Sequence, residues 1–400
     1  MKTSLLFVTF RLSSGGAEKA LENLLWELDY DKFDVDVMLF SQDSSLVSIP
    51  QQVHVLETPN DIASLAVGKP PVANGVFAEF RYLTGKVQSA AKLLANAIPN
   101  GTYRANQVKW TRMWEPCLKT LDREYDVAVG YIHGLPSYYV IDKVKAKRKY
   151  LWIHCSYQEL NADCEMDRGY FSRADKVITI SPNCLEQLKD CLPSLADMFI
   201  SLPNINRPES IVALSKSVDA SGSYAGRSVK VCSIGRLADE KGFDLAILAA
   251  NELNKEQVDF TWLVLGEGPE RAHLEELIGQ YGLGDRFMLV GRKTNPYPYL
   301  AAADIVVQSS RSEGKSVVLD EAKLLDKTIV STRYMSVDDQ ITDGVDGYLC
   351  ETDCQDIART ILRAIELGKP QGLEKSRQAL ISDMNASVEA HCRLFETGHL

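Results

Sequence analysis

The amino-acid sequence predicts an α/β protein made of two Rossmann-like α/β/α domains. Short apolar runs alternate with helical patterns in both halves of the chain, which is typical of parallel α/β architecture. The length of 400 residues is enough for two or three domains with sizeable buried cores. Each apolar run is therefore read as a buried strand, and each pattern that follows it as a covering helix.

The first half is expected to contain six strands, with a helix over 17–28 between the first two. The strands are expected at 5–10, 35–40, 53–56, 127–131, 150–154 and 176–180. In the second half the strands are expected at 229–234, 261–265, 287–290, 305–308 and 328–331. Helices are expected there at 244–254, 270–281, 317–325 and 356–367.

The domain boundary is expected after Leu202-Pro203-Asn204, because a stretch rich in Ser, Ala and Gly follows at 215–227. This gives an N-terminal domain over 1–203, a linker over 204–228 and a second domain over 229–375. The last stretch, 376–400, has a helical pattern with no strand after it.

Composition narrows the class of protein. The apolar fraction is 45%, and the net charge of -10 disfavours general affinity for nucleic acid. Nine cysteines show no C-x2-C spacing, so we expect neither a zinc site nor a disulfide framework. The apolar run at the N-terminus is too short for a signal peptide, and no run could span a bilayer. A cytoplasmic protein is expected.

Two glutamates stand eight residues apart around a strand–loop–helix junction. Glu313 and Glu321 lie in the stretch 309–322, between the strand run 305–308 and a helical pattern. Such a junction can present carboxylates and helix N-terminal amides to a single ligand.

A second motif follows the first strand of the second half. Gly235 ends that strand, and two cations, Arg236 and Lys241, come next in the pattern G-R-x4-K-G. Fixed cations at such a place can stabilise the negative charge of a departing diphosphate without a metal.

Three further candidate residues or motifs follow predicted strands. Gly15-Gly16 lies between the first strand and the first helix, where backbone amides could face an anion. Gly266 opens a Gly-x-Gly turn that lacks the third glycine of a dinucleotide fingerprint, so an NAD site is not favoured. Arg292 follows the next strand.

Together these motifs resemble retaining glycosyltransferases of the GT4 family, and bacterial capsular and exopolysaccharide members in particular. The resemblance covers nearly the whole chain and is strongest over 229–350. It implies a GT-B fold, in which two Rossmann-like domains face each other across a cleft and the C-terminal helix crosses back to the first domain. It also implies metal-independent transfer of a hexose-type sugar from a nucleotide-sugar, most simply a UDP-sugar, to a glycan or polyprenyl-linked acceptor held by the first domain.

The resemblance assigns roles to individual residues. Glu321 would hold the ribose hydroxyls, and Glu313 would lie beside the transferred sugar with catalytic cations Arg236 and Lys241 at the diphosphate. The remaining donor-binding positions would be Gly16, Gly235, Gly266, Arg292, Gly314, Lys315, Ser316 and Val317. Many relatives carry an aromatic residue followed by Pro or Gly where this chain has Lys315-Ser316, so the identity of the sugar stays open.

Two histidines follow strands of the first half. His133 matches the cleft histidine of the resembling family, which contacts the donor sugar or stabilises charge, and His154 is the second candidate. No metal site is expected. Asp34-Val35-Asp36 resembles a D-x-D metal-binding motif. The aspartates alternate with apolar residues within a predicted strand, which favours carboxylates that face outward from the sheet.

The segment 81–114 contains six basic residues and no acidic one, interleaved with leucine and aromatic residues. This composition suits peripheral contact with an anionic membrane, or else a solvated insert whose aromatic residues face the core. Two alternatives to a glycosyltransferase stay open: a nucleotide-sugar epimerase of the same fold, and a non-catalytic subunit that retains the fold.

Overall fold

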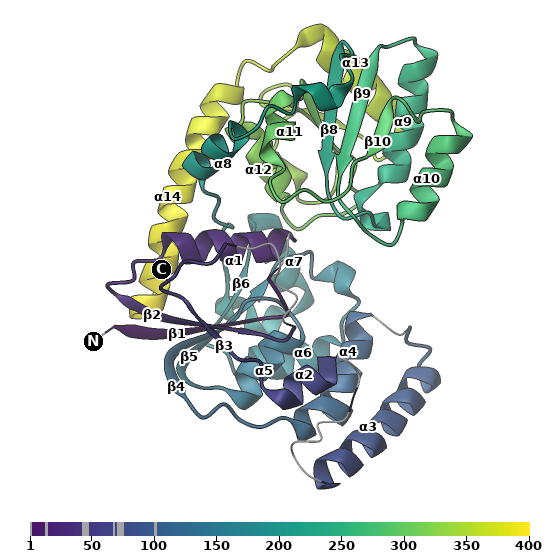
Figure 1. Cartoon of the computed structure of the whole chain (residues 1–400). Helices are drawn as coiled ribbons and strands as arrows, with labels where there is room; N and C mark the ends of the chain where they lie inside the picture. The colour runs from purple at the N-terminus through teal and green to yellow at the C-terminus, as the bar shows by residue number, and fades with distance from the viewer. Residues whose placement is uncertain (1, 13–14, 42–47, 67–68, 70–75, 100–101) are drawn as a thin grey trace. The chain divides into compact units, whose positions relative to one another are not determined.

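The computed structural model describes residues 2–12, 15–41, 48–66, 69, 76–99 and 102–400 (Figure 1). The chain divides into two compact units. The first contains Met1–Ile205 together with Ser387–Leu400, and the second contains Asn206–Ala386. Each unit has its own parallel sheet and its own hydrophobic cores.

The sheet of the first unit has seven parallel strands in the order β3-β2-β1-β4-β5-β6-β7. Leu6 and Val8 belong to one buried cluster, and Leu5 and Phe7 belong to another. Because successive side chains of a strand point to opposite faces, the sheet separates two cores. The strands are β1 (Thr3–Thr9), β2 (Phe33–Leu39), β3 (His54–Leu56), β4 (Glu124–Gly130), β5 (Lys145–Ile153), β6 (Lys176–Thr179) and β7 (Phe199–Ser201).

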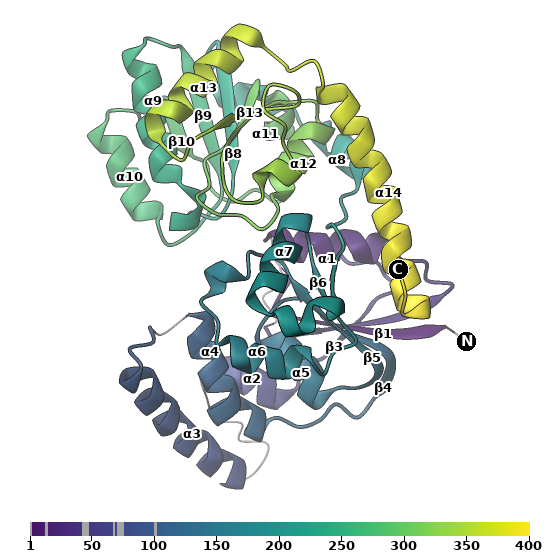
Figure 2. The ribbon, with the colours of Figure 1, turned by 180° about the vertical axis from the view of Figure 1, so that it is seen from behind.

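Helices connect these strands and cover the sheet (Figures 1 and 2). In the first unit they are α1 (Gly16–Glu27), α2 (Asn60–Ala66), α3 (Val76–Ala95), α4 (Tyr103–Lys109), α5 (Leu135–Lys143), α6 (Cys164–Phe171) and α7 (Pro182–Cys191). A single π-helical turn, Trp110–Trp114, continues directly from α4. The segment from α3 to this turn is an insert between β3 and β4, and within the described residues no helix is both long and apolar enough to cross a membrane.

The second unit repeats the arrangement with six parallel strands in the order β10-β9-β8-β11-β12-β13. The strands are β8 (Val229–Ile234), β9 (Phe260–Leu265), β10 (Phe287–Leu289), β11 (Ile305–Gln308), β12 (Thr328–Thr332) and β13 (Tyr348–Cys350). The helices are α8 (Pro208–Ser215), α9 (Phe243–Lys255), α10 (Arg271–Gln280), α11 (Tyr297–Ala302), α12 (Val317–Leu324) and α13 (Cys354–Leu367).

The fold class expected from the sequence is confirmed, since both units are parallel α/β sandwiches. Two strands were not anticipated, β7 and β13. Each has three residues and lies at the edge of its sheet, as do β3 and β10, which were anticipated. Three residues are too few for periodicity to identify every such strand.

The expected linker over 204–228 differs from the structure. Part of it forms α8, and Ser221–Tyr224 forms a 3-10 turn. Ile211 and Tyr224 are buried in a core cluster of the second unit. These two side chains anchor the segment to the second unit. They were not recognised in the sequence because the residues around them are mostly Ser, Ala and Gly.

The C-terminal helix α14 (Leu373–Thr397) returns to the first unit, as the family resemblance implies. Its last turns pack on the first sheet through Phe395, whose ring meets those of Phe7 and Phe33 at 5.7 and 6.3 Å. Arg148 donates to the carbonyl oxygen of Phe395 at 2.7 Å, which satisfies a backbone acceptor at the end of the helix.

Candidate active site

The second sheet has its topological switch point between β8 and β11, because the strand order runs outward from these two in opposite directions. In open α/β sheets ligands bind beyond the carboxyl ends of the strands at such a point. Here the loops after β8 and β11 are joined directly. Ser309 Oγ donates to the carbonyl oxygen of Lys241 at 2.9 Å, and Arg311 N donates to that of Glu240 at 2.8 Å.

Gly242 makes this approach possible. Its φ is +62°, and a Cβ there would lie 2.1 Å from the carbonyl oxygen of Ser309. Any side chain would both strain the backbone and force the two loops apart. The glycine of the G-R-x4-K-G motif is therefore explained by contact between the two loops.

The contact between the two loops places Lys241 beside Glu313. Lys241 Nζ donates to Glu313 Oε1 at 2.5 Å, and the two side chains are only 22% and 12% exposed. The same oxygen accepts from Gln308 Nε2 at 2.6 Å and Ser310 Oγ at 2.7 Å. Three donors fix the orientation of this carboxylate. Sequence reasoning missed Gln308, whose only signal is an amide at the end of an apolar strand.

Glu321 lies in the helix that follows, α12. Its side chain is buried, and Tyr297 donates its hydroxyl hydrogen to Glu321 Oε1 at 2.9 Å. The two motif glutamates thus have different surroundings. Glu313 precedes the helix and pairs with Lys241, whereas Glu321 is inside the helix and accepts a hydrogen bond from Tyr297.

The start of α12 is held by Gln340, which no local motif reveals. Its Oε1 accepts from the amide of Ser316 at 2.7 Å, and its Nε2 donates to Ser316 O and Asp320 Oδ1 at 2.7 and 2.9 Å. The sequence predicts that amides from Gly314 to Val317 face a ligand. In the structure the Ser316 amide instead bonds within the protein. Lys315 Nζ lies 3.5 Å from Asp320 Oδ2.

Arg236 does not join Lys241 and Glu313. It forms an ion pair with Glu240, four residues away, and its side chain is 64% exposed. Arg292 is also exposed. The two cations of the motif are therefore unequal in this structure, with Lys241 enclosed at the switch point and Arg236 on the surface.

The glycines at neighbouring strand ends are explained by packing. A Cβ at Gly266 would lie 1.8 Å from the carbonyl oxygen of Gly235. Gly235 N in turn donates to Leu265 O at 3.1 Å. Gly266 allows the backbones after β8 and β9 to touch, whereas a Cβ at Gly235 would lie 3.3 Å from the Phe243 ring, so neither residue type by itself requires a ligand.

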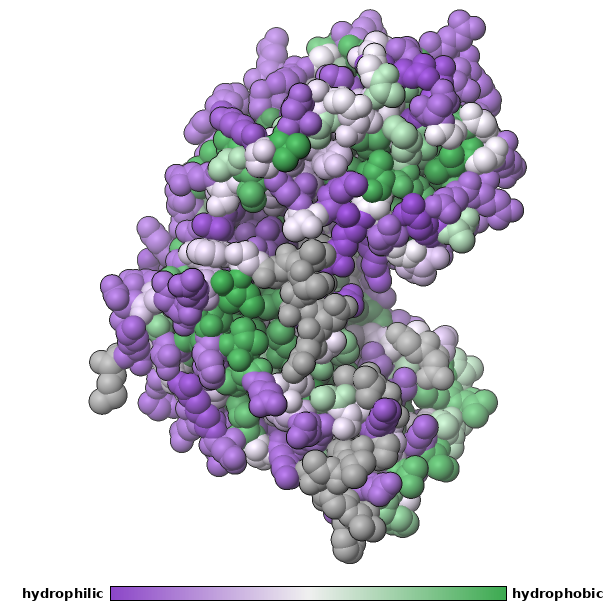
Figure 3. Space-filling model, viewed as in Figure 1, coloured by the Kyte–Doolittle hydropathy of each residue, from purple (hydrophilic) through white to green (hydrophobic). Residues whose placement is uncertain are grey.

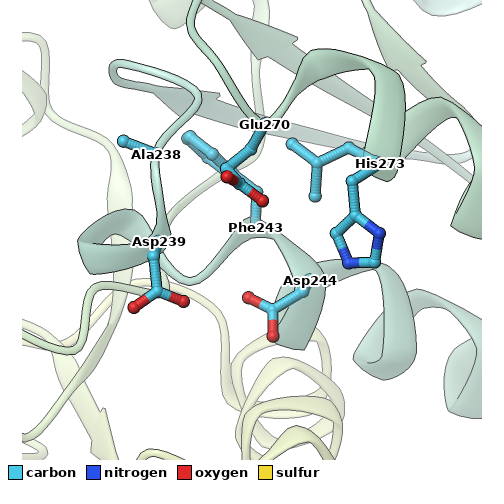
Figure 4. A pocket seen from close by; sticks show the side chains of 7 residues that line it. Ala238, Asp239, Phe243, Asp244, Glu270 and His273 are labelled. Atoms are coloured by element: carbon cyan, nitrogen blue, oxygen red, sulfur yellow. The ribbon is translucent and has the colours of Figure 1, made fainter.

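A small pocket of ≈ 60 Å³ lies beside these loops (Figure 4). Its polar lining includes Asp239, Asp244 and Glu270. Arg311 forms a two-pronged pair with Asp244 at 2.6 and 2.8 Å. Burial raises the pKa of Asp244, but the arginine outweighs this and holds it below its ordinary value. Three carboxyl groups repel a diphosphate, so this pocket does not suit that ligand.

His133 follows β4 at the switch point of the first sheet. Its ring lies 5.5 Å from that of Tyr103, and Cys155 Sγ is 3.8 Å from the ring nitrogens. Burial lowers the pKa of His133 to about 4. A neutral imidazole at physiological pH can exchange hydrogen bonds with a sugar hydroxyl, but it does not supply a positive charge.

His154 follows β5, and its ring lies 4.9 Å from that of Tyr131. Burial, and then the nearby His133, lowers the pKa of His154 to about 3. The two half-buried histidines therefore lie near each other in the first unit, and both are neutral near pH 7.

A tyrosine–carboxylate cluster that no sequence motif predicts supports this region. Asp167 is fully buried and accepts hydrogen bonds from Tyr138 at 2.5 Å, Tyr157 at 2.7 Å and Tyr103 at 3.3 Å. Burial raises the pKa of Asp167, partly offset by these donors. The cluster fixes the Tyr103 ring against His133.

Gly16 is the first residue of α1, as expected for a glycine turn between β1 and that helix. Gly15 precedes it in extended conformation and acts as the N-cap position. Arg11 lies 3.9 Å from Glu18 across the turn. Ser13 and Ser14 of the same loop lie outside the described residues.

The first unit also contains an apolar pocket of ≈ 80 Å³. Phe10 and Phe40 come from the carboxyl ends of β1 and β2, and Trp110 and Trp114 come from the π-helical turn. The full lining is Phe10, Phe40, Ile62, Trp110, Trp114, Leu118 and Leu135. These residues are scattered in sequence, so no motif predicts the pocket.

The expectation for Asp34 and Asp36 is only half right. Asp34 is exposed, whereas Asp36 is 1% exposed. Arg123 and Tyr125 cover Asp36 by donating to its Oδ2 at 2.8 and 2.5 Å. In the part of the chain that the structure describes, no group of three His, Cys, Asp or Glu residues is arranged to hold a metal ion.

Comparisons with known proteins agree with this architecture. Residues 220–382 match the family model described as glycosyl transferases group 1. Alpha-D-kanosaminyltransferase of Streptomyces kanamyceticus is 34% identical over 29% of this chain and 31% of its own length. The lipopolysaccharide core biosynthesis glycosyltransferase LpsE of Rhizobium meliloti (strain 1021) is 26% identical over 58% of this chain and 60% of its own length. The matches thus span less than two thirds of both relatives.

Among solved structures, Anabaena Alr3699/HepE in complex with UDP and glucose has a TM-score of 0.70. The alignment covers 99% of this chain and 100% of that one, at 17% sequence identity. This likeness extends over both units and identifies the fold as GT-B.

Proposed function

We propose, for a GT-B chain whose residues 220–382 form a glycosyl transferases group 1 domain, that the protein is a glycosyltransferase. It would transfer a hexose-type sugar from a UDP-sugar to a lipid-linked acceptor in polysaccharide assembly, with retention of configuration and without a metal. The observation that carries the proposal is the contact of Lys241 with Glu313 at the switch point of the second sheet.

Lys241 would stabilise the leaving nucleoside diphosphate. Negative charge accumulates on the diphosphate as the glycosidic bond breaks, and a fixed ammonium group in an enclosed place stabilises it. Glu313 holds that ammonium group at 2.5 Å before any donor arrives. Binding of a diphosphate would give Lys241 a second anionic partner, while Glu313 would accept hydrogen bonds from hydroxyls of the sugar.

Glu321 would bind the ribose of the nucleotide. A carboxylate is a good acceptor for the paired hydroxyls of ribose, and Tyr297 fixes its orientation. His133, neutral through burial, would serve as a hydrogen-bond partner for a sugar hydroxyl.

The choice of donor and acceptor has separate support. HepE, whose fold this chain shares, is bound to UDP and glucose, which favours UDP as the nucleotide. The apolar pocket in the first unit favours an acceptor with a hydrocarbon part over a fully polar glycan.

A thermal-shift screen tests the donor. UDP, GDP and ADP, each alone and as the glucose conjugate, would be added to the full chain. A ligand at about 100 times its dissociation constant adds ~2.7 kcal/mol to the free energy of unfolding. We expect stabilisation by UDP and its sugar, and loss of this effect in Glu321→Ala. No stabilisation by any nucleotide would contradict the proposal.

Product analysis tests the reaction. With donor and membrane-extracted acceptor, we expect the anomeric configuration of the transferred sugar to be retained in the NMR spectrum of the product. Conversion of the donor to a different nucleotide-sugar without acceptor would instead identify an epimerase.

A further inference from the structure

Helix α3 carries a row of large apolar side chains that face solvent. Phe80, Leu83, Val87 and Leu94 are 66%, 52%, 70% and 82% exposed. Their spacing of three, four and seven residues places them along one side of a helix. Figure 3 shows hydrophobic residues on the outer surface of the α3 region. These four residues are called the α3 stripe below.

The α3 stripe is not a core face left open by loose packing, because the opposite side of α3 is the packed one. Tyr82, Ser89 and Leu93 on that side are buried. Gly85 lets the helix approach the π-helical turn so closely that a Cβ there would lie 2.1 Å from the carbonyl oxygen of Arg112. The helix is thus anchored on one side and apolar on its free side.

Half of the basic residues near the α3 stripe lie on α3 itself, and the others lie on α4 and the π-helical turn that pack against it. The segment 81–114 contains six basic residues and no acidic one, although the whole chain has a net charge of -10. Within the described residues none of the six forms an ion pair, and the next acidic residue, Glu115, is already paired with Lys143 at 2.8 Å. The six are Arg81, Lys86, Lys92, Arg104, Lys109 and Arg112.

We propose that the α3 stripe docks this protein on an anionic lipid bilayer, with the apolar side chains inserted between headgroups and the cations beside lipid phosphates. The charge decides between the possible occupants. A second copy of the chain would bring the same six cations and repel the first, whereas an anionic bilayer attracts them and also accepts apolar side chains.

The π-helical turn links this surface to the apolar pocket. Trp110 and Trp114 of the turn line the pocket, while the turn also packs against α3. Docking at a bilayer would therefore bring the pocket close to the hydrocarbon chains of membrane lipids. Binding to lipid needs neither donor nor acceptor, so it can be measured separately from the proposed transfer reaction.

Vesicle co-sedimentation of the full chain tests the proposal. One set of vesicles contains phosphatidylcholine alone, and the other contains equal amounts of phosphatidylcholine and phosphatidylglycerol. We expect binding to the anionic set and a fall of about tenfold or more in the partition coefficient between ~50 mM and ~500 mM salt. Equal binding to both sets, insensitive to salt, would overturn the role of the cations.

Variants locate the surface. Val87→Glu with Leu94→Glu should lower the partition coefficient by about tenfold or more, and Lys86→Glu with Lys92→Glu should do the same. Val218→Glu is the matched control, because Val218 is 66% exposed in the second unit and should not matter. Nucleotide-induced thermal shifts report that each variant is folded.

Wild-type binding by both double variants would overturn the assignment of the surface. So would sedimentation velocity showing that Val87→Glu with Leu94→Glu separates a dimer into monomers, since that result would identify a second copy as the occupant of the α3 stripe.

Discussion

Lys241 and Glu313 lie 72 residues apart in the chain and form a nearly enclosed ion pair, with Nζ 2.5 Å from Oε1. The pair joins the two loops at the switch point of the second sheet. Its enclosure distinguishes Lys241 from Arg236, which is exposed and paired locally with Glu240. Arg236 would therefore have to leave Glu240 before it could face a bound diphosphate.

Replacing Lys241 tests its role in the departure of the diphosphate. Lys241→Ala should lower kcat by ~100-fold or more, as loss of a charge-stabilising donor does in other enzymes. Arg236→Ala is expected to lower kcat to a similar extent if Arg236 leaves Glu240 for the bound donor. Steady-state rates with saturating donor and acceptor measure both. Lys255→Ala, an exposed lysine of α9 paired with Glu252, is the control that should leave turnover unchanged. Wild-type turnover in Lys241→Ala would rule out this role.

The two motif glutamates should have different kinetic signatures. Glu321→Gln keeps the shape of the side chain but weakens hydrogen bonds to ribose, so it should mainly raise the KM for the donor. Glu313→Gln removes a charge next to Lys241 and the transferred sugar, so it should mainly lower kcat. The reverse pattern would show that the roles within the motif are exchanged.

Gln340 should act as a positioning residue for α12. In Gln340→Glu a carboxylate oxygen would face Ser316 O and Asp320 Oδ1, both of which accept hydrogen bonds from Gln340 in the structure. We expect a loss of about 1–3 kcal/mol in the free energy of unfolding and a higher donor KM. Urea denaturation and initial rates measure the two effects. Gln280→Glu, at an exposed position of α10, is the matched control. Unchanged stability in Gln340→Glu would show that this network does not hold the helix start.

Mild acid should destabilise the packing of α14 on the first unit. His391 is 1% exposed, and its ring is stacked on Trp152 at 5.8 Å. Burial lowers its pKa from 6.5 to about 4. The unfolded chain therefore binds a proton that the folded chain does not between those two values, and folding stability falls as pH decreases through this window.

The lowered pKa of His391 corresponds to a loss of ~3 kcal/mol in the free energy of unfolding once the pH is below the pKa of the folded state. His391→Gln should reduce the dependence of the urea midpoint on pH between about pH 7 and pH 4.5. His133 and His154, whose pKa values are also lowered, leave some dependence in this variant. His273→Gln, an exposed histidine of α10, should behave as wild type. A pH profile unaltered by His391→Gln would contradict this account.

Chelation tests the metal-free mechanism. With Lys241 as the charge that faces the diphosphate, transfer should proceed in excess EDTA at an unchanged rate. Loss of activity on chelation and recovery with Mn²⁺ or Mg²⁺ would require a metal in the reaction.

The sequence by itself determined the features that depend on local pattern. Buried parallel strands leave long apolar runs, so both α/β units and nearly all central strands could be located to within a few residues. The spacing of Glu313 and Glu321 and the glycine–cation loop after β8 are likewise local. Short edge strands β7 and β13, and the two buried anchors in the supposed linker, left too weak a pattern to be found.

Only the tertiary structure decided which of these residues meet. The order β9-β8-β11 places the loops after β8 and β11 side by side, and no residue within either loop encodes that neighbour. The same holds for Gln340 on Ser316 and for Tyr103 against His133, which join segments 24 and 30 residues apart. The sequence showed that the segment 81–114 is basic and carries leucine and aromatic residues, but only the packing of α3 showed that the α3 stripe faces solvent. Local periodicity reports which side of an element is apolar, whereas long-range packing determines what that side contacts.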